Sequence, residues 1–171
     1  KATYLKQVIL TIEDWDSISP RCIRQEFAIP LRNKNTRPRS RLHSLASNFF
    51  ATASEMAVCK VLGVPFPTDR VNTFKAKPDI DPNIEVRYGM DPHSPLIVRR
   101  DDRDDRLGIL VVADPPIFLV IGWYPMKLAR RADWWVSQPS NVLPGRFEVP
   151  QSALYSIETV IWDEHMGLKA I

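Results

Sequence analysis

The sequence has few cysteines and no long apolar run, the features that are typical of disulfide-rich secreted, zinc-finger and membrane-spanning proteins. Its 171 residues include only two cysteines and six glycines, and it has no apolar run long enough to cross a membrane. Residues 1–10 lack the long apolar stretch and the small-residue cleavage site of a signal peptide. We therefore expect a cytoplasmic protein with no membrane partner.

The cysteines and histidines do not form a recognisable catalytic or zinc pattern. Cys22 and Cys59 lie far apart and lack CxxC spacing, so we expect both to be reduced and structural. His43 and His93 have no catalytic partner at a familiar spacing, and His165 stands in an acidic run. Serine- or cysteine-nucleophile chemistry therefore has no support in the sequence.

The composition is that of a single globular domain spanning residues 1–171. The chain is 44% hydrophobic and 25% charged, which suffices for a sizeable core. Fifteen prolines against six glycines favour a β-rich fold with few helices. Within this domain we expect an N-terminal strand and a basic segment in residues 1–42, and the core in residues 43–162.

The net charge of +3 is unevenly distributed. Glu26 is the one acid in the segment 21–41, whose basic residues are Arg21, Arg24, Arg32, Lys34, Arg37, Arg39 and Arg41. Cations that approach phosphates release condensed counterions, so a polyanion-binding stripe is one interpretation. A solvated loop is the other, and the sequence leaves both open.

Residues 43–62 give the clearest secondary-structure signal, an amphipathic helix. Apolar residues recur mostly at three- and four-residue spacings, and Gly63 supplies a stop. Before it, residues 4–12 predict a strand followed by a turn or short helix. After Pro65 and Pro67, short apolar runs predict an antiparallel meander, at residues 71–75, 84–88, 96–100, 107–113 and 117–123.

The remaining segments complete an α+β fold with a mixed, mostly antiparallel central sheet and one long helix. The charged turn 101–105 predicts a solvated hairpin tip. Further expectations are a short helix at 125–135, a strand at 147–149, a single turn at 150–154 and a closing strand at 155–162.

Three acidic residues suggest a metal site. Glu85 and Arg87 lie two apart in a predicted strand, so their side chains share a face. A tight turn across Pro82 and Asn83 would bring Asp79 close to Glu85. Neighbouring carboxylates repel one another unless a cation offsets their charge, and Mg²⁺ prefers such oxygen ligands.

These residues resemble a known signature. Pro78-Asp79 followed by Glu85-Val86-Arg87, with Glu55 on an upstream helix, is similar to the PD-(D/E)xK (restriction-endonuclease-like) nuclease superfamily. Residues 96–123 and 149–154 also resemble a group of small phage-associated proteins of this class. The resemblance implies a Mg²⁺-dependent deoxyribonuclease, a hydrolase of the endonuclease kind, with Mn²⁺ as substitute metal and DNA as partner. It also implies a phage-encoded protein acting in the host cell, and it leaves a homodimer open.

The resemblance assigns a role to each site residue. Glu55, Asp79 and Glu85 would hold the metal, and Asp79, Glu85 and Arg87 would carry catalysis. For DNA binding, which the basic segment suggests apart from the resemblance, the candidates are Arg37, Arg39, Arg41, Lys75 and Lys77, and Lys75 and Lys77 could instead reach the site.

Two features depart from the family pattern. The signature lysine is Arg87, whose guanidinium binds phosphate but cannot act as a base. The helix that normally follows the third core strand has only a weak signal.

Alternatives to a nuclease remain. One is a catalytically weak or inactive protein of the same fold that binds nucleic acid or a protein partner, and another is a protein whose basic segment binds an acidic partner. Asp79 and Asp81 are also common turn formers, while Glu85 and Arg87 could lie on an exposed strand face and Glu55 on a solvated helix surface. The order of the motif, rather than any single residue, favours a site.

Overall fold

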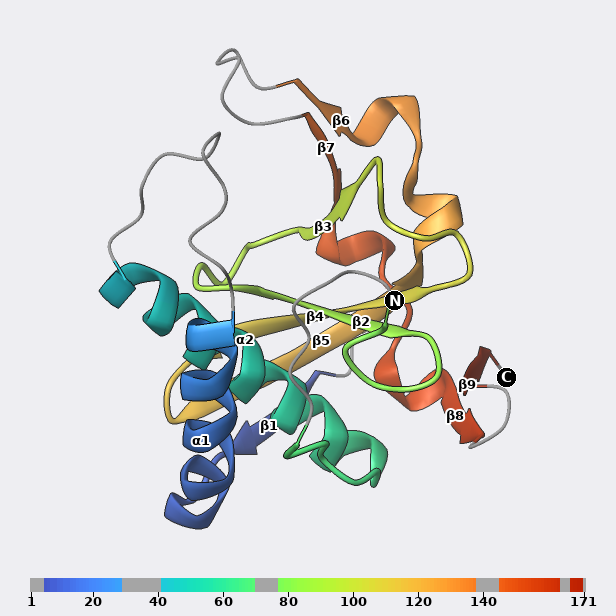
Figure 1. The fold of residues 1–171 in the computed structure, drawn as a ribbon. Helices are drawn as coiled ribbons and strands as arrows, with labels where there is room; N and C mark the ends of the chain where they lie inside the picture. Colours follow the sequence, from blue (N-terminus) through green and yellow to red (C-terminus); the bar gives the residue numbers. More distant parts are fainter. Residues whose placement is uncertain (1–4, 29–40, 70–76, 138–144, 164–166, 171) are drawn as a thin grey trace.

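The computed structural model describes residues 5–28, 41–69, 77–137, 145–163 and 167–170, and of residues 28, 41 and 160–170 it describes the backbone alone (Figure 1). This part of the chain is an α+β structure with two α-helices and three sheets. Neither helix is long and apolar enough to cross a membrane. The predicted strand at 71–75 lies outside the described residues.

The main sheet has four strands in the order β1-β5-β4-β2. β4 and β5 form an antiparallel hairpin, β1 is antiparallel to β5, and β2 is parallel to β4. The sheet is therefore mixed and mostly antiparallel, as predicted. Its strands are β1 (Lys6–Ile9), β2 (Ile84–Gly89), β4 (Leu107–Asp114) and β5 (Ile117–Pro125).

The prediction of a simple meander was wrong because β3 (Leu96–Arg99) leaves the main sheet. It pairs with β7 (Arg146–Val149), and β7 pairs with β6 (Trp135–Val136), in a second, three-stranded sheet. Parallel strands need a long crossover connection between them. The segment from β2 to β4, which contains β3, serves as that crossover.

The C-terminal segments follow the predictions in part. A strand appears at β7, and a single 3-10 turn follows at Gln151–Ala153. The short helix predicted at 125–135 is two 3-10 turns, Met126–Ala129 and Ala132–Trp134. The closing strand, β8 (Val160–Asp163), begins later than predicted and pairs with β9 (Gly167–Ala170), whereas Tyr155 forms an isolated bridge to Trp123 of β5.

Helix α2 (Arg41–Leu62) confirms the strongest sequence signal. It ends at Gly63, whose φ of 69° lies in the left-handed region that glycine adopts without strain. Its apolar face packs against the main sheet through Ala53, Met56 and Ala57, which are buried in one core with strand residues.

Helix α1 (Ile12–Ala28) corrects the expectation of a turn or short helix after β1. A reciprocal cap starts it, because Asp14 accepts a hydrogen bond from the Thr11 backbone and donates its own backbone N–H to the Thr11 hydroxyl. Ile18 and Cys22 of this helix are buried in the core. The N-terminal segment thus contributes to the core that was expected only in residues 43–162.

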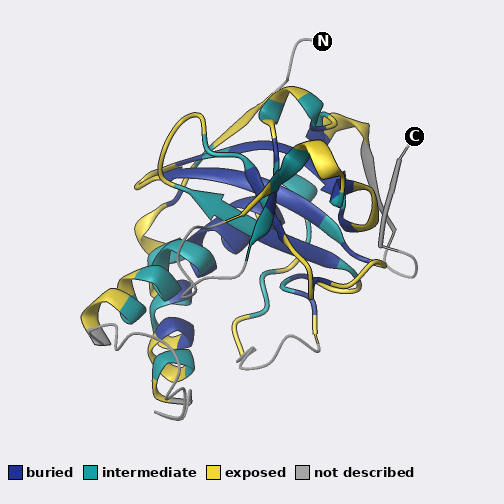
Figure 2. Cartoon of the chain, turned by 90° about the horizontal axis from the view of Figure 1, so that it is seen from above, coloured by how far each residue is buried: buried dark blue, intermediate teal, exposed yellow. Residues whose placement is uncertain are grey.

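Two apolar cores lie on opposite faces of the main sheet, whose central strands are buried along most of their length (Figure 2). Along β4, Ile109 and Val111 face the core beneath the helices, while Leu110 and Val112 face the core beneath the second sheet. The sequence of a strand that is covered on both faces is a continuous apolar run. The main sheet is therefore the middle layer, and residues at its edges can reach either side.

Candidate functional site

Asp79 lies at the outer edge of β2, where a turn folds the chain back on itself. Its backbone N–H donates to the carbonyl of Ile84 at 2.9 Å, and its Oδ2 accepts a hydrogen bond from the Val86 N–H at 2.9 Å. An isolated bridge between Ile80 and Ile84 closes the same turn. The turn across Pro82 and Asn83 therefore brings Asp79 to the start of β2, and the approach of its carboxylate to Glu85 stays a prediction.

The electrostatic setting of Asp79 is a balance between burial and positive charge. Burial raises the pKa of the Asp79 carboxyl above its ordinary value, because water no longer solvates the charged form. The Val86 hydrogen bond and the charges of Arg87, Arg21 and Arg106 act in the opposite direction, yet the pKa remains raised. Asp79 is therefore a half-buried acid whose pKa stays raised although positive charges lie nearby.

Glu85 is buried and bound by two arginines. Its Oε2 accepts a hydrogen bond from Arg87 Nη1 at 3.1 Å, and its Oε1 accepts one from Arg106. Ile84 and Val86 face the helix-side core, so the alternation of the strand directs Glu85 and Arg87 to the opposite face. The prediction that these two side chains lie together is confirmed, and Arg106 is an additional partner.

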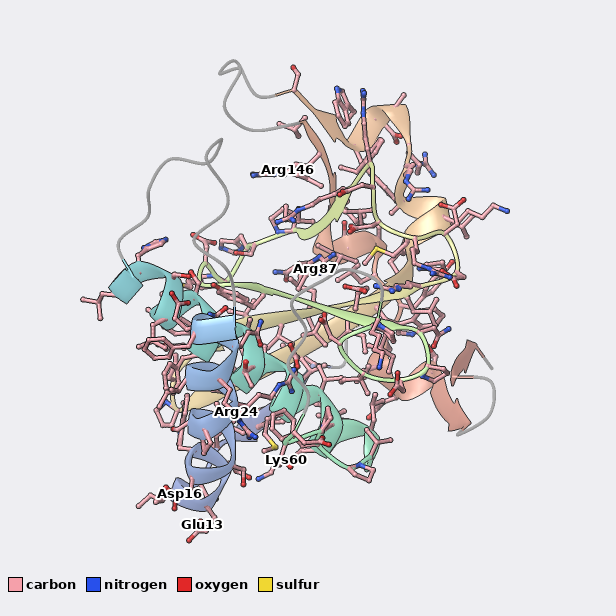
Figure 3. All side chains as sticks on the ribbon, in the orientation of Figure 1. Glu13, Asp16, Arg24, Lys60, Arg87 and Arg146 are labelled. Carbon is pink, nitrogen blue, oxygen red and sulfur yellow. The ribbon has the colours of Figure 1, made fainter. Side chains whose placement is uncertain are left out.

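Arg87 connects β2 to the turn between β3 and β4. Its Nη2 donates to Asp102 Oδ1 at 2.9 Å, and the Asp102 side chain is only 4% exposed. Figure 3 shows Arg87 between the main sheet and the second sheet. The prediction that residues 101–105 form a solvated tip was wrong for Asp102, because a buried carboxylate here balances the charge of Arg87.

Glu55 lies on the helix side, paired with Arg21 of α1. Arg21 Nη2 and Glu55 Oε2 are 2.5 Å apart, and both side chains are buried. Arg21 also donates to the carbonyl of Pro67 and stacks over the ring of Phe66. Arg21 is thus the partner in a buried ion pair. The sequence had suggested that it belongs to a solvated loop or to a polyanion-binding stripe, and both interpretations are wrong for Arg21.

The three predicted metal ligands therefore come from different sides of the main sheet. Glu55 lies in the helix layer, Glu85 faces the second sheet, and Asp79 lies at the strand edge between them. Among the residues that the structure describes, no group of three or more His, Cys, Asp or Glu is close enough to share a metal ion. A site with all three ligands does not fit this arrangement.

A smaller metal site fits the donor chemistry better. Mg²⁺ is usually held by one or two protein carboxylates, with waters and substrate phosphate completing its shell. Asp79 and Glu85 offer hard oxygen donors at the start of β2, and a cation beside Asp79 would favour its charged form over the protonated form that burial favours. Both oxygens of Glu85 already accept hydrogen bonds from arginines, so its ligation would require one of these contacts to open.

The predicted DNA-binding residues are only partly described. Lys77 is exposed, two residues before Asp79. Arg41 begins helix α2, and its side chain lies outside the description. Arg37, Arg39 and Lys75 lie outside the described residues.

Sequence reasoning missed three residues that complete the buried ion pairs: Arg21, Asp102 and Arg106. For Arg21 a signal existed, because it stands three residues after Ile18 and next to Cys22 on the apolar stripe of α1. Asp102 and Arg106 stand in a charged run with no periodicity, so local sequence gave no reason to place them inside.

The chain matches no family model, no curated protein and no solved structure at the significance required of a relative. Its function is therefore inferred from its own residues and their geometry.

Proposed function

We propose that this protein is a metal-dependent nuclease that hydrolyses phosphodiester bonds of DNA, built on a restriction-endonuclease-like core. The observation that carries the proposal is Asp79, a half-buried acid with a raised pKa at the edge of the sheet, beside the Glu85 and Arg87 pair. Acids with perturbed pKa values next to specific charge partners are more frequent at functional sites than elsewhere. The order of Asp79, Glu85 and Arg87 in the sequence supports the same function.

Each residue has a distinct role in this proposal. Asp79 and Glu85 provide the carboxylate oxygens that would hold Mg²⁺ or Mn²⁺. A divalent ion held there would supply Lewis-acid chemistry, activating water and offsetting charge on the phosphate. A guanidinium cannot act as a base, so Arg87 would orient the phosphate and stabilise its developing negative charge. Lys77, exposed nearby, adds positive charge for the nucleic-acid backbone.

A specific observation favours a second candidate function, nucleic-acid binding without turnover. Arg106 and Arg87 together bind both oxygens of Glu85. A carboxylate compensated in this way has less need of a metal ion. A protein that kept the fold while exchanging a metal for arginine charge would bind phosphates without cleaving them.

Cleavage assays on purified protein separate the two candidates. Single- and double-stranded DNA and RNA are incubated with the protein in Mg²⁺ or Mn²⁺. We expect DNA to be cut, and we expect Asp79→Asn and Glu85→Gln to lower the rate by roughly 100-fold or more, the effect of removing charge that stabilises a transition state. Both changes keep the size of the side chain, and the amide oxygen that Asp79→Asn introduces can still accept the Val86 N–H.

The matched control is Glu158→Gln, the same type of change at an exposed residue paired with Lys6. It should leave cleavage unchanged. Calorimetric titration with Mn²⁺ gives a readout independent of turnover, and we expect binding by the wild type but not by Asp79→Asn. Wild-type protein that leaves every nucleic acid intact in both metals contradicts the nuclease, and salt-sensitive DNA binding that survives Asp79→Asn then supports the second candidate.

A further inference from the structure

The turn between β3 and β4 is anchored by one of its acids. Asp102 is buried, whereas the other acids of the turn are exposed. Its Oδ2 accepts the backbone N–H of Arg99 at 2.7 Å, and its Oδ1 accepts Arg87 Nη2 at 2.9 Å. Burying a carboxylate is costly unless charged or polar partners compensate it. Asp102 therefore has a set of partners that a solvated turn acid would not need.

Asp102 is itself held from a third segment of the chain. Arg130, which follows the first 3-10 turn after β5, donates to the backbone carbonyl of Asp102 and to the carboxylate of Asp104. The Arg130 contacts fix the backbone of the turn, while the Arg99 N–H fixes the Asp102 carboxylate. The orientation of Asp102 is thus determined before any ligand is present.

Two carboxylates in turn hold the guanidinium of Arg87. Nη1 donates to Glu85 and Nη2 donates to Asp102, so the plane of the group is fixed between β2 and the turn. The Arg87 side chain is still 23% exposed, and part of it can be reached from outside. A long side chain fixed in advance loses less conformational entropy when it binds an anion.

We propose that Asp102 is a positioning residue, which acts through Arg87 by holding its guanidinium in the orientation that binds a backbone phosphate of DNA. This inference rests on the proposed function, in which Arg87 contacts phosphate. Glu85 alone, two residues from Arg87 on the same strand, fixes one nitrogen of the guanidinium. Asp102 fixes the other and prevents rotation about the remaining bonds.

A double-mutant cycle on cleavage tests the role. The variants are Asp102→Asn, Arg87→Ala and the double variant, with Asp105→Asn as the matched control because Asp105 is an exposed acid of the same turn that pairs with Arg103. We expect Asp102→Asn to lower kcat by roughly 10- to 100-fold, the range for losing a partner that orients a site residue. In the Arg87→Ala background the same change should have no further effect, because the group it positions is gone.

A purely structural role of Asp102 gives a different pattern. In that case Asp102→Asn lowers the urea midpoint, and it lowers the activity by the same factor in the wild type and in Arg87→Ala. The two losses of activity then multiply in the double variant. Multiplying losses, or an Asp102→Asn variant as active as Asp105→Asn, would overturn the inference. Asp102→Glu, which keeps the charge and shifts the carboxylate by one methylene, replaces Asp102→Asn in the cycle if the latter fails to fold.

DNA binding distinguishes failure of this inference from failure of the proposed function. Absence of cleavage by the wild type refutes the nuclease by itself. The slope of log Kd against log salt still reports phosphate contacts, with about 0.9 for each contact to duplex DNA. A slope reduced by about that amount in both Asp102→Asn and Arg87→Ala, but not in Asp105→Asn, supports positioning. An unchanged slope in Asp102→Asn, or no DNA binding by the wild type, overturns it.

Discussion

Replacing Glu55 should show how strongly the buried ion pair of the helix layer stabilises this fold. Arg21 and Glu55 are 2.5 Å apart, with side chains 1% and 9% exposed. Removing one member of such a pair leaves the other charge buried without compensation, at a cost of about 3–5 kcal/mol. Arg21 keeps its hydrogen bond to the Pro67 carbonyl, so we expect Glu55→Met to cost about 3 kcal/mol, the lower end of that range.

Urea unfolding measures this loss. Small proteins lose roughly 2 kcal/mol of stability per molar urea, so a 3 kcal/mol loss lowers the midpoint by about 1.5 M. Arg21→Met should lower it similarly, and the double variant should be no worse than either single variant, because no buried charge remains. Glu158→Gln at the exposed Lys6 pair is the control, with an expected cost of about 0–1 kcal/mol.

Two results would refute this reasoning. One is a Glu55→Met midpoint within error of the Glu158→Gln control, which would mean that Arg21 does not depend on Glu55. The other is a double variant whose loss equals the sum of the two single losses, which would mean that the two side chains act independently. If the cycle holds, the charge of Glu55 serves the fold.

The remaining predictions concern Asp79 and Gly122. The folded protein holds the Asp79 proton more tightly than the unfolded chain does, so the contribution of Asp79 to stability should be lost as pH rises from 3.8 through its raised pKa. Urea midpoints across that range should fall less in Asp79→Asn than in the wild type. Parallel curves for the two proteins would contradict the assignment. A Cβ on Gly122 would lie 2.5 Å from the Tyr155 carbonyl oxygen. Gly122→Ala should therefore lower the free energy of unfolding by about 1–3 kcal/mol, measured by thermal unfolding. An unchanged Tm would show that the Tyr155 backbone can move.

Much of the local structure could be predicted, because local patterns specify it. The apolar spacing of residues 43–62 and the stop at Gly63 gave α2 within two residues of its observed start. The apolar runs at 107–113 and 117–123 gave β4 and β5. A turn or short helix was predicted at the start of α1, where Thr11 and Asp14 form its cap, but its length was missed, since Pro20 and several polar residues weaken its apolar period.

The candidate site divides in the same way. That Glu85 and Arg87 share a face, and that a turn folds Asp79 back onto β2, follow from strand alternation and turn chemistry. The buried partners Arg21, Asp102 and Arg106 come from α1 and from the crossover between β2 and β4. Their roles depend on contacts between segments distant in sequence, which no local period encodes.

The sequence by itself determined α2, β2, β4 and β5 and which side chains alternate along these strands, because periodicity, capping and turn residues act over a few neighbouring positions. Only the tertiary structure decided that β3 joins a second sheet, that β2 and β4 run parallel, and that Glu55 and Glu85 face opposite sides of the main sheet. The physical reason is that the balance of buried charge depends on which distant segments meet, and that is settled only when the layers pack.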